Sequence, residues 1–125
     1  MDFYFLALIL GRIFIGGIFV VAGIQHFQHF DPPLAIMKGR SVPYAAPLLV
    51  LGSVWEIVLG ALIMIGFWGA PAALGLILFL IPATIIFHNF WDYQGIARVH
   101  HMHVVMTNVM VAGGLLALIA ASHTG

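Results

Sequence analysis

Residues 44–67 read YAAPLLVLGSVWEIVLGALIMIGF, and Glu56 is the one charged side chain in this apolar run. A helix that spans a bilayer needs about 20 mostly apolar residues, so the run is long enough to cross a membrane. Long runs without apolar–polar alternation favour helices over a transmembrane barrel. Three further runs share this character, at about residues 3–25, 72–90 and 104–121. We therefore expect an all-α integral membrane protein, a four-helix bundle forming one domain over residues 1–125.

The composition supports a lipid environment. Hydrophobic residues make up 63% of the chain and charged residues 6%, and the mean hydropathy is +1.15. These polar residues are too few to cover the surface of a water-soluble protein of this size. We therefore expect the lipid bilayer as the first partner. The formal net charge is zero, with no basic patch to follow a phosphate backbone, and nucleic acid is not an expected partner.

Two further features limit the chemistry and the processing of the chain. It contains no cysteine, so it can form neither a structural disulfide nor a Cys-x-x-Cys thiol relay of its own. Its first apolar run lacks a preceding basic segment and a small-residue cleavage site, and it is long enough to span. We expect this run to be a retained helix rather than a removed signal peptide.

Four spans place both termini at one end of the bundle, called the terminal end, and two polar segments, 26–43 and 89–103, at the other, called the loop end. A short interfacial helix fits within residues 26–43. The basic residues Lys38, Arg40 and Arg98 all belong to the loop end. The positive-inside rule assigns that end to the cytoplasm, which places both termini on the periplasmic or exterior side of the inner (plasma) membrane.

Arg12 and Glu56 are charged residues inside the first and second predicted spans. Such a residue costs about 2.5 to 3.5 kcal/mol at mid-membrane and normally faces the bundle interior with a partner. At about 1.5 Å per residue, both lie about 15 Å from the terminal end. We expect a buried ion pair between helices that approach closely through glycines spaced four apart. The pair either fixes helix register only, or forms the polar floor of a ligand site with Glu56 as a proton-binding group.

Six of the seven histidines lie at the loop end, where they end the first and third spans or precede the fourth. The simplest interpretation is an amphipathic ring at a wet interface. A histidine pair from different helices, such as His88 and His101, would be the alternative basis for a haem site. His26 with His29, and His100 with His103, have helical spacing, but no carboxylate set or H-E-x-x-H pattern accompanies them. We therefore expect no dedicated metal site.

Asn108 lies inside the fourth span on the same helical stripe as His101, and this stripe should face inward. Its amide makes either an interhelical hydrogen bond or a contact to the polar head group of a ligand. Aromatic residues could line such a cleft or serve as packing and interfacial anchors; they are Trp55, Phe87, Phe90 and Trp91. No nucleophile elbow or phosphate-binding glycine loop is present, which argues against a hydrolase or a phosphotransferase.

Several short motifs, in this order and across four spans, resemble the DoxX family of small bacterial membrane proteins; they are GRIFIGG (11–17), GIQHF (23–27), the Glu56 span, FHNFW (87–91), Thr107-Asn108 and GGLL (113–116). The resemblance implies a four-helix membrane bundle related to subunits of thiosulfate:quinone oxidoreductase and other membrane redox assemblies. It also matches the family's polar pattern at Arg12, Gln25, His26, Glu56, His88, Asn89, Trp91 and Asn108. Family members often have Lys at the position of Thr107, and relatives that handle disulfides use cysteines.

The resulting hypothesis is a membrane-embedded subunit of a redox system that binds a quinone-like apolar ligand within the bundle. The candidate binding residues are the eight matched to the family pattern, together with His101. Quinone is the first candidate cofactor and haem the second, and the expected partners are further copies of the chain or other membrane redox proteins. The alternative is a non-enzymatic membrane scaffold or assembly partner. A transporter is disfavoured, because four spans with one mid-membrane ion pair offer no continuous polar path.

Overall fold

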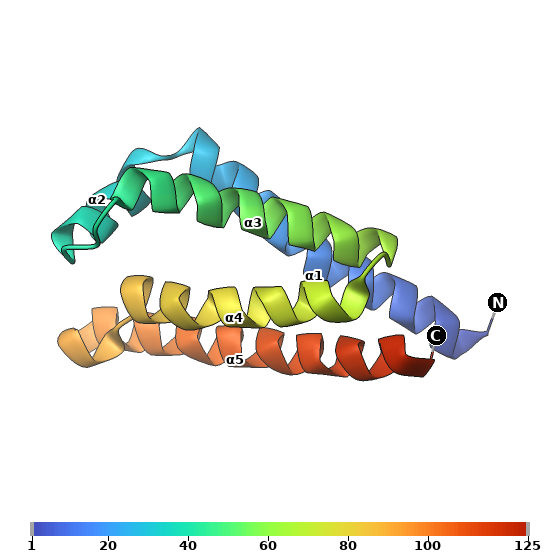
Figure 1. Ribbon diagram of the computed structural model, residues 1–125. Coiled ribbons are helices and arrows are strands. Elements are labelled where there is room, and N and C mark those ends of the chain that lie inside the picture. The colour runs from blue at the N-terminus through green and yellow to red at the C-terminus, as the bar shows by residue number, and fades with distance from the viewer. Residues whose placement is uncertain (1, 125) are drawn as a thin grey trace.

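The computed structural model describes residues 2–124, which form α-helices and one short 3-10 helix (Figure 1). In chain order the elements are α1 (Phe3–Gln28), α2 (Asp31–Gly39), α3 (Ala45–Ile65), α4 (Gly69–Phe87), η1 (Phe90–Asp92) and α5 (Gly95–Thr124). Four helices are long and apolar enough to cross a membrane, namely α1, α3, α5 and the segment formed by α4 with η1. The predicted all-α bundle with four spanning helices is confirmed.

Local sequence signals explain where the helices begin and end. The Asp2 side chain accepts a hydrogen bond of 2.8 Å from the backbone N–H of Phe5 and caps the start of α1. Pro32 and Pro33 lie in the first turn of α2, where a missing N–H breaks no helical hydrogen bond. Gly66 ends α3 with a φ of +78°, a left-handed conformation that glycine adopts without strain. The short helix expected within residues 26–43 is thus present as α2.

The last helix starts earlier than the apolar run that predicts it. α5 begins at Gly95 rather than near residue 104, so His100, His101 and His103 lie on the helix and not in a polar connection. Histidine and arginine lower the hydropathy of a segment without preventing a helix, whereas Gly95, with a φ of +64°, marks the boundary. At 30 residues α5 is longer than the about 20 that span a bilayer.

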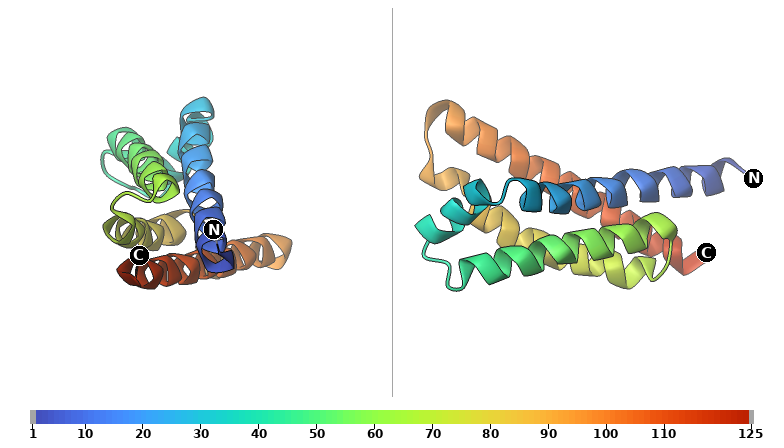
Figure 2. Two further views of the ribbon diagram at one scale, coloured as in Figure 1. Left: turned by 90° about the vertical axis from the view of Figure 1, so that its right-hand side faces the viewer. Right: turned by 90° about the horizontal axis from the view of Figure 1, so that it is seen from above.

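The spanning helices form two antiparallel pairs, α1 with α3 and α4 with α5, as Figures 1 and 2 show. The pairs lie close together at the terminal end and diverge toward the loop end, where α2 packs against α3 and α4. The N-terminal turns of α1 extend beyond the rest of the bundle (Figure 1), and Phe3 and Tyr4 are exposed there.

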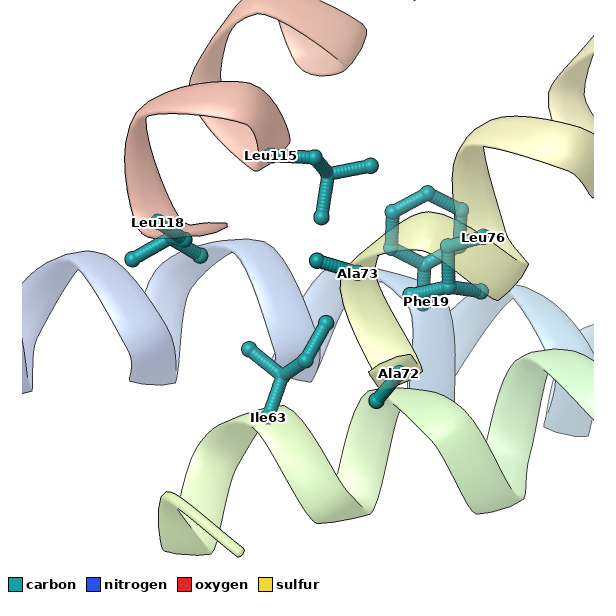
Figure 3. Close-up of a cluster of buried hydrophobic side chains, with 7 residues drawn as sticks. All are labelled: Phe19, Ile63, Ala72, Ala73, Leu76, Leu115 and Leu118. Atoms are coloured by element: carbon teal, nitrogen blue, oxygen red, sulfur yellow. The ribbon is translucent and has the colours of Figure 1, made fainter. Parts of the chain in front are cut away.

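Two apolar clusters hold the halves of the bundle together. The larger one takes side chains from all four spanning helices, and Figure 3 shows its members converging; they are Phe19, Ile63, Ala72, Ala73, Leu76, Leu115 and Leu118. The smaller one, at the loop end, is built on Met37, Ala45 and Leu49. Because the larger cluster packs the terminal half of the bundle and α2 covers the loop end, the space between the two clusters is where the diverging pairs leave room for a site.

The glycines in α1 and α3 allow the two backbones to touch. A Cβ atom added at Gly23 would lie 2.7 Å from the Ser53 carbonyl oxygen, and one at Gly60 would lie 2.7 Å from the Gly16 carbonyl oxygen. Real Cβ atoms do not approach so closely, so only glycine fits at these positions. These two contacts fix the register of α1 against α3.

This register shows that the predicted Arg12–Glu56 ion pair is wrong. The Arg12 guanidinium lies beside Gly66, with its Nη1 atom 3.1 Å from the position of a Cβ at that glycine. Gly66 is ten residues beyond Glu56, or about 15 Å along the helix. Arg12 and Glu56 would be level only if α1 and α3 ended together at the terminal end, whereas α1 extends past α3 there (Figure 1). Arg12 instead lies at the C-terminus of α3, where the helix dipole favours a cation.

Candidate functional site

A central polar cluster, formed by His26, Ser53 and Glu56, lies between α1 and α3. The His26 Nδ1 atom is 3.1 Å from the Glu56 Oε1 atom and 3.2 Å from the Ser53 Oγ atom. The Ser53 hydroxyl donates its proton to the Leu49 carbonyl oxygen at 2.7 Å, so toward His26 its oxygen can only accept. This arrangement assigns a proton to His26 Nδ1, which donates to Ser53 and lies close to Glu56.

Glu56 is buried within the bundle and incompletely satisfied. The residue is 4% exposed, and among residues 2–124 no donor is aligned with its Oε1 atom for a hydrogen bond. The His26 contact meets the distance of an ion pair but not the directionality of a hydrogen bond. A buried carboxyl group without full pairing is costly, more so in a membrane. Glu56 therefore has an oxygen free to interact with a proton or with a ligand.

Glu56 faces a cavity of about 560 Å³ that is bordered by α1, α4 and α5 and is also lined by residues of α2. Most of its wall is apolar and includes Phe14, Ile18, Phe79 and Phe87. Its polar side chains come from every spanning helix, and they are His26, Glu56, His88, Thr107 and Asn108. A largely apolar pocket of a few hundred Å³ with a few polar groups is typical of a small-molecule site.

Asn108 is bonded within the bundle as well as facing the cavity. Its Nδ2 atom donates a hydrogen bond of 2.9 Å to the Thr84 hydroxyl on α4. The expected interhelical hydrogen bond is therefore present, and it holds the amide beside the cavity lining. The carbonyl oxygen of Asn108 is an acceptor that this bond does not use.

A second set of polar residues joins the two halves of the bundle at the loop end. Asn89, which is 1% exposed, accepts a short hydrogen bond from the Arg40 guanidinium at its Oδ1 atom. Its Nδ2 atom donates to the Asp92 carboxylate at 2.6 Å. Arg40 also lies 3.9 Å from that carboxylate and 3.5 Å from the Tyr93 hydroxyl. Arg40 thus fastens the α2–α3 connection to the α4–α5 connection.

The histidine pair predicted to face each other does so. His88 and His101 approach to 3.2 Å between their Nδ1 atoms, and the Tyr93 ring stacks on His101 with centroids 4.3 Å apart. Two imidazoles in hydrogen-bond contact cannot also bind opposite sides of one haem iron, so the arrangement does not fit a haem site. Among the side chains that the structure describes, no three from His, Asp or Glu gather in a way that could hold a metal ion.

The candidate residues therefore fall into three groups. His26, Glu56, His88 and Asn108 line one cavity, while Asn89 and His101 support it from the loop end. Gln25 is exposed on α1, Trp91 is 54% exposed beside Phe90, and Arg12 lies near Gly66; none of these three lines the cavity.

Sequence reasoning missed Ser53 and the structural role of Arg40. A hydroxyl residue three positions before Glu56 in an apolar helix shares its face, and that spacing was the available signal for Ser53. From the sequence, Arg40 indicates only the membrane orientation, as a positive charge at the loop end. Its partner Asn89 is 49 positions away along the chain, and no local pattern connects the two.

Fold and site together define a small integral membrane protein with four spanning helices and a polar-floored cavity inside the bundle. The DoxX family profile matches residues 7–89, so the chain belongs to the DoxX family. It is 29% identical over 111 residues to the inner membrane protein YphA of Escherichia coli strain K12, an alignment that covers 89% of this chain and 79% of that protein. No solved structure matches.

Proposed function

We propose that this protein is a membrane-embedded subunit of a redox system and binds a quinone-like ligand in the 560 Å³ cavity. The observation that carries the proposal is Glu56, a buried carboxyl group with an oxygen that lacks an aligned donor, on the wall of an otherwise apolar cavity. A ligand that fits must be apolar over most of its surface and must offer polar atoms at one edge.

A quinone has this distribution of polarity, with an apolar ring and two carbonyl oxygens that accept hydrogen bonds. When it is reduced to the quinol, each oxygen takes up a proton. The residues of this chain that would hold such a ring are the cavity-lining His26, Glu56, His88 and Asn108. A protonated Glu56 or the His26 ring would donate to one carbonyl oxygen, and His88 to the other. Arg12 takes no part in this proposal, because it lies away from the cavity.

The electrons have to come from a partner protein. The chain has no cysteine for thiol chemistry, and its own part is to bind the quinone, orient it and supply protons. We infer the bacterial inner membrane as its location, because the similar YphA is an inner membrane protein and four helices of this chain are able to span. The loop end, with Lys38, Arg40 and Arg98, would then face the cytoplasm.

The test is quinone binding by the purified protein in phospholipid nanodiscs, followed by quenching of tryptophan fluorescence. The ligand is the tailless 2,3-dimethoxy-5-methylbenzoquinone, which the cysteine-free chain cannot capture through a thiol. Glu56→Leu should weaken binding by about tenfold or more, since one hydrogen bond to a charged or buried group contributes roughly 1.5 kcal/mol. Leucine suits an apolar helix, so the variant should fold.

Arg12→Leu is the matched control, because it also removes a charged side chain from a spanning helix but outside the cavity. Its affinity for the quinone should equal that of the unmodified protein. The proposal is wrong if the unmodified protein shows no saturable binding, or if Glu56→Leu binds as well as Arg12→Leu. A chain that binds no quinone would instead fit a scaffold or assembly partner.

A further inference from the structure

A second cavity adjoins the first. It has a volume of about 320 Å³ and lies between α3 and α4, where α2 also contributes to its lining. Five residues line both cavities, namely His26, Glu56, Phe79, Ala83 and Phe87. The two spaces are therefore neighbours that share the wall formed by these residues, and they extend to different sides of the bundle: the first toward α1 and α5, the second toward the α3 surface.

The second cavity differs from the first in polarity. Its polar side chains are His26, Ser53 and Glu56, which form the central polar cluster at the junction, and the rest of its lining is apolar. Its outer wall includes Leu51 and Trp55, which are 64% and 47% exposed on the surface of α3. In a spanning helix such exposed apolar side chains face lipid, so the second cavity borders the hydrocarbon of the bilayer, as the first does at Phe14 and Ile18, which are 65% and 68% exposed.

We propose that the second cavity holds the isoprenoid tail of the ligand whose head group occupies the first cavity. This inference rests on the proposed function and specifies its ligand class as a tailed, membrane-dissolved quinone rather than a small soluble one. Two neighbouring cavities, of which the first carries His88, Thr107 and Asn108 beside the central polar cluster and the second is apolar beyond it, suit a molecule with a polar ring and a long apolar chain. The tail would leave the bundle between α3 and α4 and rejoin the hydrocarbon layer.

Gly52 lies on the wall of the second cavity, next to the Phe79 ring. It lines the second cavity and not the first, and a Cβ atom added there would lie 3.2 Å from Cε1 of the Phe79 ring. The backbone of Gly52 therefore packs against the Phe79 ring, and any side chain at residue 52 would have to displace that ring. A leucine at this position would extend into the second cavity and displace the Phe79 ring, which lines both cavities, but it would leave the polar side chains of the first cavity unchanged.

The experiment compares two quinones on two variants in phospholipid nanodiscs, again by tryptophan quenching. The ligands are the tailless 2,3-dimethoxy-5-methylbenzoquinone and decylubiquinone, which has the same ring and an apolar tail. The matched variants are Gly52→Leu and Gly113→Leu, the latter at a glycine with no neighbouring atom within 4 Å of an added Cβ. Each quinone partitions into the bilayer to the same extent for every variant. The ratio of a quinone's dissociation constants for two variants is therefore independent of this partitioning.

We expect Gly52→Leu to weaken decylubiquinone binding by about tenfold or more, because each methylene kept out of an apolar site costs roughly a factor of four. Binding of the tailless quinone should stay within about twofold of the unmodified protein, and this also shows that the variant is folded. Gly113→Leu should change neither. If Gly52→Leu binds neither quinone, the comparison is repeated with Gly52→Ala, which places a smaller side chain in the second cavity.

The inference is overturned if Gly52→Leu and Gly52→Ala bind decylubiquinone as the unmodified protein does. Such a result would indicate that acyl chains of bilayer lipids, rather than a quinone tail, occupy the second cavity. It is equally overturned if both quinones weaken in parallel in Gly52→Ala, since that would mean a general disturbance. These outcomes are separate from failure of the proposed function, which is seen when the unmodified protein does not bind the tailless quinone.

Discussion

Gly23→Ala should loosen α1 from α3 and disturb the central polar cluster. The added Cβ would lie 2.6 Å from Ile57 Cγ1 and 2.7 Å from the Ser53 carbonyl oxygen, against 3.4 Å or more for an ordinary contact. A backbone carbonyl cannot rotate away as a flexible side chain can, so α1 must withdraw by most of that difference. Overpacking of this kind costs about 1–3 kcal/mol. His26 lies one turn further along α1 and should lose its 3.1 Å contact with Glu56.

The free energy of unfolding in mixed detergent–SDS micelles, monitored by circular dichroism, measures this cost. Gly17→Ala is the matched control on the same helix, because its added Cβ would lie 3.8 Å from the flexible Met64 side chain. The control should be as stable as the unmodified protein or slightly more so, since alanine favours helix over glycine. Equal stability of Gly23→Ala and Gly17→Ala would refute the claim that backbone contact at Gly23 sets the helix register.

Three further predictions concern the loop end and the α4–α5 contact. Arg40→Ala should lower the free energy of unfolding by about 1–3 kcal/mol in the same assay, because buried Asn89 loses its donor; an unchanged value would show that Arg40 does not hold the α2–α3 and α4–α5 connections together. A double-mutant cycle of Asn108→Leu with Thr84→Val should give a coupling of about 0.6 kcal/mol, and zero coupling would deny the bond. In spheroplasts, Lys38→Cys on this cysteine-free background should react with a membrane-impermeant maleimide only after permeabilisation, whereas labelling of intact spheroplasts would reverse the topology.

The sequence is sufficient for the fold because hydrophobic run length is a direct physical requirement of the bilayer. Four apolar runs become four helices able to span, and helical spacing correctly places Glu56 and Asn108 toward the interior. The same reasoning brings His88 and His101 together, since both lie where their helices meet the loop end. In each case the prediction depends on one helix at a time or on which end of a span a residue occupies.

The register and divergence of the helices relative to one another cannot be predicted from one segment at a time. The position of Arg12 within its own span does not fix its depth relative to α3. That depth depends on the register of α1 against α3, which backbone contact at Gly23 and Gly60 determines. The apolar run predicts a span from near residue 104, whereas α5 begins at Gly95, because hydropathy detects the apolar layer and not the helix that continues past it. The two cavities depend on the divergence of the helix pairs toward the loop end, which no single segment encodes.

The most direct test of a quinone site at Glu56 is mass spectrometry of the small molecules extracted from protein purified in mild detergent. The unmodified protein and Arg12→Leu should carry close to one quinone per chain or per assembly, while Glu56→Leu, prepared in parallel, should carry no more than a mock preparation. If quinone is absent from the unmodified protein, or present equally in Glu56→Leu, the cavity lined by Glu56 is not a quinone site.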